Sequence, residues 1–207
     1  MKKKKVQKKN TVLYIDENLV SLAKKFKLNL SQITESAIKS HLYPFLPAGE
    51  RQLFFLSHIE ELKRDGMCFF LSAAIKSIQI KNVRLFKDLK LTFKEGINII
   101  YGPNSSGKTT LIRIIAEMNE LLEKTSNGKE KTIRIEFSPE SKISIEYYNK
   151  KTDKHECVLL DEPVERLVEE NKKQFLSWLK KEYAGSQIIL TTIDEEFSHL
   201  GNNRIVL

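Results

Sequence analysis

The sequence predicts an α/β fold, a sheet-based core preceded by a small N-terminal module. Three short apolar runs, at residues 97–102, 157–160 and 187–192, have the composition of strands that are buried on both faces. Segments with helical periodicity separate these runs, which is typical of helices packed against a sheet. The first 46 residues differ in composition from the remainder, which indicates a separate module.

The positive charge of the chain is concentrated at its N-terminus. The 207 residues have a formal net charge of +8, and residues 1–46 alone carry ten lysines against three acidic residues. Residues 47–207 are therefore nearly neutral. A basic segment on a neutral body predicts an anionic partner, most often nucleic acid.

Cysteine spacing and hydropathy exclude several classes of protein. Cys68 and Cys157 form neither a disulfide framework nor a zinc pattern, so we expect inert thiols in a reducing compartment. No apolar run approaches the roughly 20 residues that span a bilayer. The lysine-rich start lacks the apolar segment of a signal peptide. We therefore expect a cytoplasmic, nucleoid-associated protein without a membrane partner.

Residues 1–46 have the pattern of one strand followed by two short helices. Residues 11–15 favour a strand, Asp16 is placed to cap one helix, and Asn29 or Ser31 is placed to cap a second that ends near Pro44. So few residues cannot bury a core alone. We therefore expect a homodimer in which two such strands pair. Dimerisation without DNA binding is the alternative.

This pattern, with "YIDENLV" and "KKFKLNLSQ", resembles the ribbon–helix–helix DNA-binding module over residues 9–43, especially its antitoxin-like branch. The resemblance implies that the paired strands enter the major groove of double-stranded DNA. It also implies that the second helix holds a phosphate at its N-terminus and that the lysines add salt-dependent contacts. The residues expected to contact DNA are Lys8, Lys9, Asn10, Val12, Tyr14, Leu30, Ser31 and Gln32, with Lys2–Lys5 nearby.

The connector, residues 47–75, carries no predicted chemistry. We expect a helix from Glu50 to Arg64 with one apolar face, a turn at Asp65–Gly66, and a short apolar strand. These residues are too apolar for a free linker. They are therefore expected to dock on the core, residues 76–207, or on a partner chain.

The segment "GPNSSGKTT" carries the phosphate-binding pattern G-x-x-x-x-G-K-[ST] between a buried strand and an amphipathic helix. Its glycines allow a tight loop whose N–H groups cradle an anion. Lys108 is expected to contact the β- and γ-phosphates, and the Thr109 hydroxyl to ligate Mg²⁺. The sequence therefore predicts an ATP–Mg²⁺ site lined by Gly102, Pro103, Asn104, Ser105, Ser106, Gly107, Lys108, Thr109 and Thr110.

Two carboxylates follow the apolar run 157–160. Asp161 is expected to hold Mg²⁺ through a water, and Glu162 to act as the general base for the water that attacks the γ-phosphate. Pro163 is expected to begin a helix that extends to residue 183. Capping of that helix is the purely structural alternative for the two carboxylates. We also expect strands at 76–83, 89–93 and 203–207 and a hairpin at 132–148.

The phrases "IKNVRLFKDL", "GPNSSGKTT", "VLLDEP" and "IILTT", in this order, resemble the ATP-binding-cassette ATPases, in particular the branch of SMC and DNA-repair proteins. The resemblance covers residues 76–122 and 156–207 and implies a P-loop NTPase core. It also implies that Arg84, Phe86 and Lys87 lie near the adenine.

The match departs from the family at four places. Residues 111–156 contain no glutamine to sense the γ-phosphate, and no Leu-Ser-Gly-Gly-type signature precedes "VLLDEP". Ile193 stands where the family has a histidine, and Val168 stands near the expected aspartate. The parts that hold ATP and Mg²⁺ are present, together with Glu162 as the base.

We therefore expect a DNA-binding ATPase in which ATP–Mg²⁺ binding and slow hydrolysis regulate DNA binding or assembly, in chromosome or plasmid organisation or segregation. The alternative is a ribbon–helix–helix transcriptional or antitoxin-like regulator that binds ATP without turnover. A transporter ATPase subunit is disfavoured by the N-terminal module and by the missing motifs.

Overall fold

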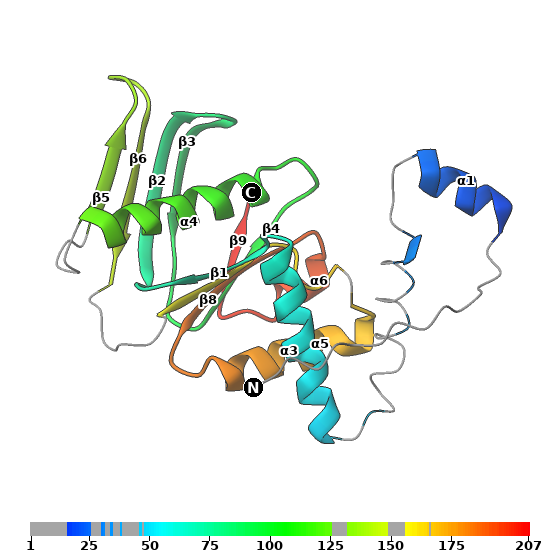
Figure 1. Cartoon of the computed structure of the whole chain (residues 1–207). Helices are drawn as coiled ribbons and strands as arrows, with labels where there is room; N and C mark the ends of the chain where they lie inside the picture. The colour runs from blue at the N-terminus through cyan, green and yellow to red at the C-terminus, as the bar shows by residue number, and fades with distance from the viewer. Residues whose placement is uncertain are drawn as a thin grey trace. The chain divides into compact units, whose positions relative to one another are not determined.

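The computed structural model of the chain (Figure 1) describes residues 16–25, 30–31, 34, 38, 46, 48–125, 132–148, 156–165 and 167–207. The chain divides into two compact units, residues 1–38 and 39–207, and each is treated by itself. The three-part division expected from the sequence, at residues 46 and 75, stays a prediction.

The first unit contains helix α1 (Glu17–Lys25). The Asp16 carboxylate accepts a hydrogen bond from the backbone N–H of Asn18 at 2.9 Å, which confirms that Asp16 caps this helix. The predicted strand 11–15 and most of the second helix lie outside the described residues, and so do six of the predicted DNA contacts: Lys8, Lys9, Asn10, Val12, Tyr14 and Gln32. Leu30 and Ser31 are helical.

Five strands of the second unit form a sheet in the order β1-β7-β8-β4-β9. Strand β1 is antiparallel to β7, whereas β7, β8, β4 and β9 run parallel to one another. The three apolar runs of the sequence are its central strands, and every residue of β7 and β8 is buried, as predicted. The bounds are β1 Cys68–Leu71, β4 Ile97–Tyr101, β7 Cys157–Leu160, β8 Gln187–Thr192 and β9 Asn203–Val206.

Four further strands form an antiparallel sheet in the order β3-β2-β6-β5. The predicted hairpin at 132–148 is confirmed, with Ile133 opposite Ile145. Strand β3 begins three residues earlier than expected because Val83 pairs with Phe86 across a two-residue turn. The bounds are β2 Ile75–Val83, β3 Phe86–Thr92, β5 Thr132–Glu136 and β6 Lys142–Tyr147.

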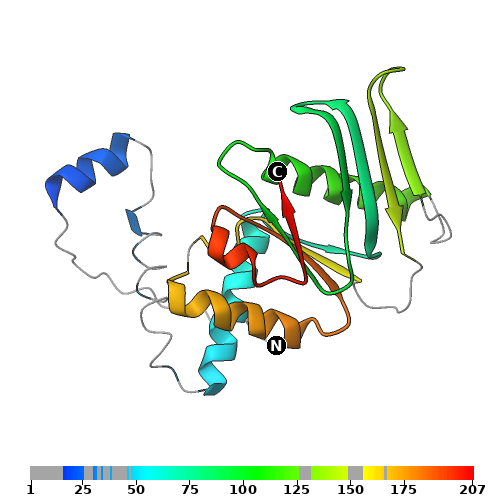
Figure 2. The same cartoon turned by 180° about the vertical axis from the view of Figure 1, so that it is seen from behind.

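Helices cover both faces of the parallel sheet (Figure 2). Helix α4 (Lys108–Thr125) and the antiparallel sheet share one core cluster with Leu159 and Ile189. Helices α3 (Ala48–Arg64) and α5 (Glu169–Glu182) share the other with Leu160 and Leu190. Neighbouring residues of one strand thus pack into opposite cores, as period-two alternation requires. A short helix, α6 (Glu195–Ser198), follows β8.

The prediction that Pro163 begins a helix is wrong. Residues 163–165 form a turn, closed by a bond from Glu165 N–H to the Glu162 carbonyl at 3.4 Å, and α5 begins only at Glu169. Glu162 has a left-handed φ of 47°, so the chain leaves β7 in a direction that does not continue into a helix. Val168 is the N-cap residue of α5.

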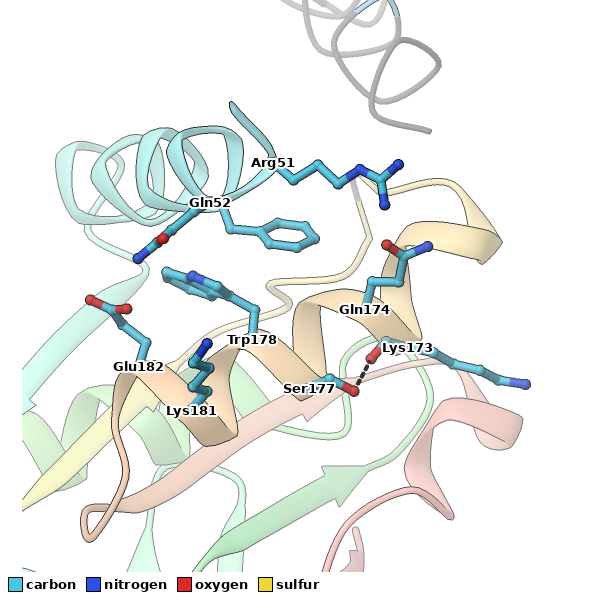
Figure 3. A pocket seen from close by; sticks show the side chains of 9 residues that line it. Arg51, Gln52, Lys173, Gln174, Ser177, Trp178, Lys181 and Glu182 are labelled. Atoms are coloured by element: carbon cyan, nitrogen blue, oxygen red, sulfur yellow. Dashed lines mark hydrogen bonds between the residues drawn. The ribbon is translucent and has the colours of Figure 1, made fainter. Parts of the chain in front are cut away.

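A surface groove lies between α3 and α5 (Figure 3). It contains none of the residues that the sequence assigned to a site, and we assign it no ligand. Within the described part of the chain, no helix is both long and apolar enough to cross a membrane. The groove is lined by Arg51, Gln52, Phe55, Lys173, Gln174, Ser177, Trp178, Lys181 and Glu182.

Candidate functional site

The strand order brings together the two motifs that the sequence singled out. Strand β8 lies between β4, which leads into "GPNSSGKTT", and β7, which leads into Asp161. All three strands are parallel, so their carboxyl ends meet at one edge of the sheet, where ligands of α/β proteins bind. The last residues of β8, Thr191 and Thr192, lie between the two motifs.

The loop after β4 is anchored at its start and at its end. The backbone N–H of Gly102 donates to the Thr192 carbonyl at 3.3 Å, which ties the loop to β8. The N–H of Leu111 donates to the Gly107 carbonyl at 2.8 Å, the first turn of α4. Ser105 and Gly107 have positive φ values of 67° and 101°, which fold the loop tightly enough to turn N–H groups inward.

Close packing explains why Gly107 has no side chain. A Cβ at this position would lie 2.6 Å from Leu85 Cδ1 and 2.9 Å from Phe86 Cζ. The turn between β2 and β3 therefore presses directly on the loop. The hydroxyl of Ser106 is buried without a hydrogen-bond partner among the described residues, so the loop holds a polar atom that a phosphate oxygen would satisfy.

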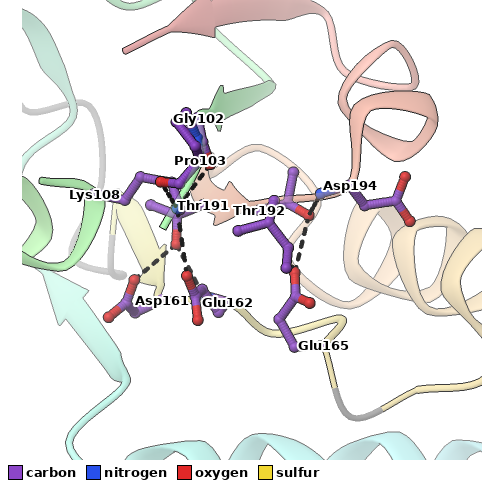
Figure 4. Close-up of polar contacts among 10 residues, drawn as sticks. Gly102, Pro103, Lys108, Asp161, Glu162, Glu165, Thr191, Thr192 and Asp194 are labelled. Atoms are coloured by element: carbon purple, nitrogen blue, oxygen red, sulfur yellow. Dashed lines mark hydrogen bonds and ion pairs between the residues drawn. The ribbon is translucent and has the colours of Figure 1, made fainter. Parts of the chain in front are cut away.

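Lys108 extends into the site and is only 3% exposed. Its ammonium donates to the Gly102 carbonyl at 2.9 Å and to the Pro103 carbonyl at 3.0 Å. Oε1 of Glu162 lies 3.5 Å away, so the loop lysine and the predicted base form an ion pair (Figure 4). Because lysine is a compact point charge on a long stem, the same ammonium is able to reach phosphate oxygens bound in the loop.

Asp161 and Glu162 are fixed by Thr191 of β8 and by Met67, the residue before β1. The buried Asp161 donates its backbone N–H to the Met67 carbonyl at 2.8 Å, and its Oδ1 accepts a bond from the Thr191 hydroxyl at 2.7 Å. The backbone N–H of Glu162 donates to the same hydroxyl at 2.8 Å. Left-handed φ in a residue other than glycine costs roughly 1–3 kcal/mol, and such strain gathers at functional sites.

A second polar network joins Thr192 to the loop after the two carboxylates. The Thr192 hydroxyl lies 3.3 Å from Oε1 of Glu165 and accepts the backbone N–H of Asp194 at 3.0 Å. Asp194 caps α6 and forms an ion pair with Lys172 of α5. The residue after Thr192, Ile193, also donates its backbone N–H to the Glu165 carboxylate at 3.3 Å. The Glu165 carboxylate therefore contacts two successive residues at the end of β8.

Helix α3 is fastened to the same loop. Nε2 of His58 lies 2.7 Å from the carbonyl of Pro163, and the His58 ring packs edge-on against Phe175. The contact joins the helix that follows the N-terminal unit to the residue next to Glu162.

Neither cysteine takes part in the site, and both are buried and free. Burial raises the pKa of Cys68 to about 12 and also raises the pKa of Cys157. The thiolate is the reactive form, so both groups are inert in the folded protein, as the sequence predicted.

The structure brings together the predicted residues Gly102–Thr110, Asp161 and Glu162. It also adds contributors that the sequence did not indicate, namely Thr191, Thr192 and Glu165. Two threonines at the end of a fully buried apolar strand were the available signal, because buried hydroxyls require partners. The predicted roles of all these residues stay predictions, as does the proximity of Arg84, Phe86 and Lys87 to an adenine.

The donor set fits a magnesium ion that shares its ligands with phosphates. Thr109 and Asp161 offer hard oxygen donors, which Mg²⁺ prefers, and Mg²⁺ commonly takes one or two protein ligands plus substrate phosphates. The described residues contain no group of three or more His, Cys, Asp or Glu side chains that would hold a metal by themselves.

Comparison with known families decides the class of the second unit. Residues 74–206, well over half of the chain, match the family described as AAA ATPase domain. The chain belongs to this family. The AAA ATPase domain assignment accounts for the P-loop, for the α/β architecture, and for nucleotide binding as the general property of the site.

Short stretches of the chain are similar to parts of larger proteins. The chain is 46% identical over 41 residues to the DNA replication and repair protein RecF of Bacillus cytotoxicus, which is 20% of this chain and 11% of RecF. It is 46% identical over 44 residues to the Septu protein PtuA of Bacillus thuringiensis, 21% and 11% of the two chains. It is 42% identical over 41 residues to the Rad50 double-strand break repair ATPase of Methanopyrus kandleri, 20% and 5%.

The chain thus spans about a tenth or less of the length of these relatives. The expected P-loop NTPase core is confirmed as an AAA ATPase domain, and short stretches of the chain are similar to DNA-repair proteins. The ribbon–helix–helix module, the homodimer and DNA binding stay predictions.

Only residues 148–156 separate β6 from β7, which leaves no length for a helical subdomain between them.

Proposed function

We propose that the protein is a DNA-binding ATPase in which the P-loop unit binds ATP–Mg²⁺ and hydrolyses it slowly, and in which nucleotide state regulates DNA binding or assembly. The observation that carries the proposal is the convergence of Lys108, Asp161 and Glu162 at one sheet edge, with Lys108 Nζ 3.5 Å from Glu162 Oε1. A phosphate-binding lysine beside a carboxylate that can orient a water is an arrangement suited to phosphoryl transfer to water.

Each site residue has a distinct role in the proposed hydrolysis. The loop N–H groups and Lys108 hold the β- and γ-phosphates, and Lys108 exchanges its two carbonyl contacts for phosphate oxygens. Bound Mg²⁺ would neutralise phosphate charge, with the Thr109 hydroxyl as a ligand and Asp161 holding the ion through a water. Glu162 orients the attacking water and accepts its proton as the water oxygen bonds to the γ-phosphorus and the bond to the bridging oxygen breaks. The products are ADP, phosphate and a proton released to solvent.

The N-terminal unit would supply DNA binding and self-association. Support comes from the charge distribution, ten lysines in the first 46 residues, and from the resemblance to the ribbon–helix–helix module. Two names among the relatives, RecF and Rad50, belong to DNA-repair proteins. Chromosome or plasmid organisation or segregation, in the cytoplasm at the nucleoid, is the process this combination favours.

Light scattering of the Glu162→Gln protein tests nucleotide binding, DNA binding and assembly together. ATP–Mg²⁺ and duplex DNA are added separately and jointly, and ATP–Mg²⁺ is expected to change either the assembly size or the affinity for DNA. Lys108→Ala is the control and should lose the nucleotide effect while keeping DNA binding. No change in DNA affinity or assembly with ATP–Mg²⁺ would contradict the coupling.

A regulator that binds ATP without turnover is the second candidate. It is favoured by Ile193 in place of the family's histidine and by the short segment 148–156, which cannot contain a signature subdomain. Without those contacts, other groups must stabilise the charge of the transition state or hydrolysis is slow. Phosphate release distinguishes the two candidates, since only the ATPase releases it.

A further inference from the structure

One side chain contacts both residues of the Asp-Glu pair. The hydroxyl of Thr191 donates to Asp161 Oδ1 at 2.7 Å and accepts the backbone N–H of Glu162 at 2.8 Å. Thr191 is fully buried at the end of β8, between the strand of the P-loop and the strand of the two carboxylates. A hydroxyl has a single donor, so these two bonds also fix the direction of its O–H group.

The bond to Asp161 determines which carboxylate oxygen is left for another ligand. Oδ1 accepts the Thr191 hydroxyl, whereas Oδ2 accepts no hydrogen bond from the residues that the structure describes. Partners that hold a metal-binding carboxylate in this way set its orientation and affect metal affinity. Thr191 would therefore present Oδ2 toward a ligand at the edge of the sheet.

The bond to Glu162 holds the backbone of the proposed base. Glu162 has a φ of 47°, a conformation that residues other than glycine adopt only when surrounding contacts enforce it. The Thr191 hydroxyl receives the N–H of this residue, and the Glu162 side chain then lies within 3.5 Å of Lys108. Loss of the hydroxyl would leave this N–H without its acceptor and would allow the backbone to relax.

We propose that Thr191 is a positioning residue for the reaction at this site: its hydroxyl aligns the metal-side carboxylate of Asp161 and the base Glu162 simultaneously. The proposal rests on the proposed function, because it assigns Thr191 a role in ATP–Mg²⁺ use. It goes beyond that function by predicting that the Mg²⁺ requirement and the turnover rate depend on a residue that does not itself touch the reacting atoms.

Substitutions at Thr191 distinguish the effect of its hydroxyl from the effect of its methyl group on packing. Thr191→Val keeps the branched shape and removes the hydroxyl, whereas Thr191→Ser keeps the hydroxyl and removes the methyl group. Thr132→Val makes the same chemical change at an exposed position of strand β5, away from the site, and is the matched control. If Thr191→Val fails to fold, Thr191→Ala replaces it.

The readouts are kcat, KM for ATP at saturating Mg²⁺, and the Mg²⁺ concentration that gives half of the maximal rate. Thr191→Val is expected to lower kcat about 10–100-fold and to raise the Mg²⁺ requirement about tenfold, the usual range for partners of metal ligands. KM for ATP should change less than about threefold, because the P-loop contacts are intact. Thr191→Ser and Thr132→Val should stay close to the wild type.

Three outcomes would overturn the proposal, and the third applies where the wild type releases no phosphate. Unchanged kcat and Mg²⁺ requirement in a folded Thr191→Val protein would show that the hydroxyl is dispensable, and equal losses in Thr191→Val and Thr191→Ser would show that packing matters instead. If the wild type releases no phosphate, the hydrolytic function fails by itself. The Thr191 proposal is then decided by ATP affinity measured over a range of Mg²⁺ concentrations, with EDTA as the metal-free reference. Thr191→Val should need about tenfold more Mg²⁺ than the wild type to reach its full ATP affinity, and equal Mg²⁺ dependence would overturn the proposal.

Discussion

The ammonium of Lys108 lies 3.5 Å from Oε1 of Glu162, although the two residues are 54 positions apart in the chain. The contact places the phosphate-binding lysine beside the proposed base. Lys108 is buried and donates hydrogen bonds to two loop carbonyls, so removal of its charge removes these contacts and the ion pair with Glu162.

Lys108→Ala is expected to weaken ATP binding by about 10–100-fold, because a charge-assisted contact of roughly 1.5–3 kcal/mol is lost. Titration of the purified protein with a fluorescent ATP analogue measures the effect. Lys124→Ala, at the exposed far end of α4, is the matched control and should bind as the wild type does. Equal affinity in Lys108→Ala and wild type would exclude the P-loop as the nucleotide site.

Gly107→Ala is expected to destabilise the protein more than Gly185→Ala does. Both glycines have φ between 89° and 101°, so both substitutions cost backbone strain of about 1 kcal/mol or more. A Cβ at Gly107 would also meet Leu85 at 2.6 Å, whereas one at Gly185 meets nothing within 4 Å. Urea unfolding measures the difference, and equal losses would show that the β2–β3 turn does not press on the loop.

His58→Ala is expected to lower the free energy of unfolding by about 2–3 kcal/mol, since a buried acceptor loses its partner and a packed ring is removed. The affected contacts are the bond to the Pro163 carbonyl and the edge of Phe175. His199→Ala, at an exposed position, serves as the control in the same urea titration. Losses of unfolding free energy of similar size in both variants would argue against the idea that α3 stabilises the turn after Glu162.

The ion pair of Lys172 and Asp194 predicts a pH-dependent stability. Burial is the largest influence on Asp194 and opposes ionisation, but hydrogen bonds from Lys172 and from Phe197 N–H together outweigh it and lower the pKa of Asp194 below 3.8. Burial likewise opposes the charge of Lys172, and its bonds to Asp194 and Glu169 still raise the pKa of Lys172 above 10.5.

Each partner of the ion pair stabilises the fold over its own range of pH. The stability that Asp194 contributes is present above the ordinary carboxyl pKa and is lost as pH falls through the lowered pKa of the folded state. The stability that Lys172 contributes is present below the ordinary lysine pKa of 10.5 and is lost as pH rises through the raised pKa of the folded state. Asp194→Asn is therefore expected to cost about 1 kcal/mol near pH 7, and less below about pH 4. Urea midpoints at several pH values measure this, with Asp88→Asn, in an exposed 3.8 Å pair, as control. A cost independent of pH would contradict it.

Local sequence patterns were sufficient to predict the strands and the P-loop that form the site. The runs at 97–102, 157–160 and 187–192 became adjacent buried strands because a fully apolar strand has no face that water covers. The P-loop pattern placed Lys108 at the start of α4, and the order of motifs indicated the type of ATPase. These signals depend on residues close in sequence, which is why they were readable.

The features that sequence did not predict depend on contacts between distant residues. Pro163 reads locally as the first residue of a helix, but Asp161 N–H bonds to Met67 and Glu162 turns left-handed, so α5 starts at Glu169. Thr191 belongs to the site only because β8 lies between β7 and β4. No local spacing encodes that strand order.

Phosphate release from ATP–Mg²⁺ by the wild type and by Glu162→Gln tests the central claim most directly. The wild type is expected to release phosphate slowly, and Glu162→Gln should release it about 10²–10⁴-fold more slowly, the usual contribution of a general base. Nucleotide binding should persist in Glu162→Gln, because Lys108 and the loop are unchanged. Equal phosphate release by the two proteins, or none by the wild type while it binds ATP, would contradict the claim that this site hydrolyses ATP with Glu162 as the base.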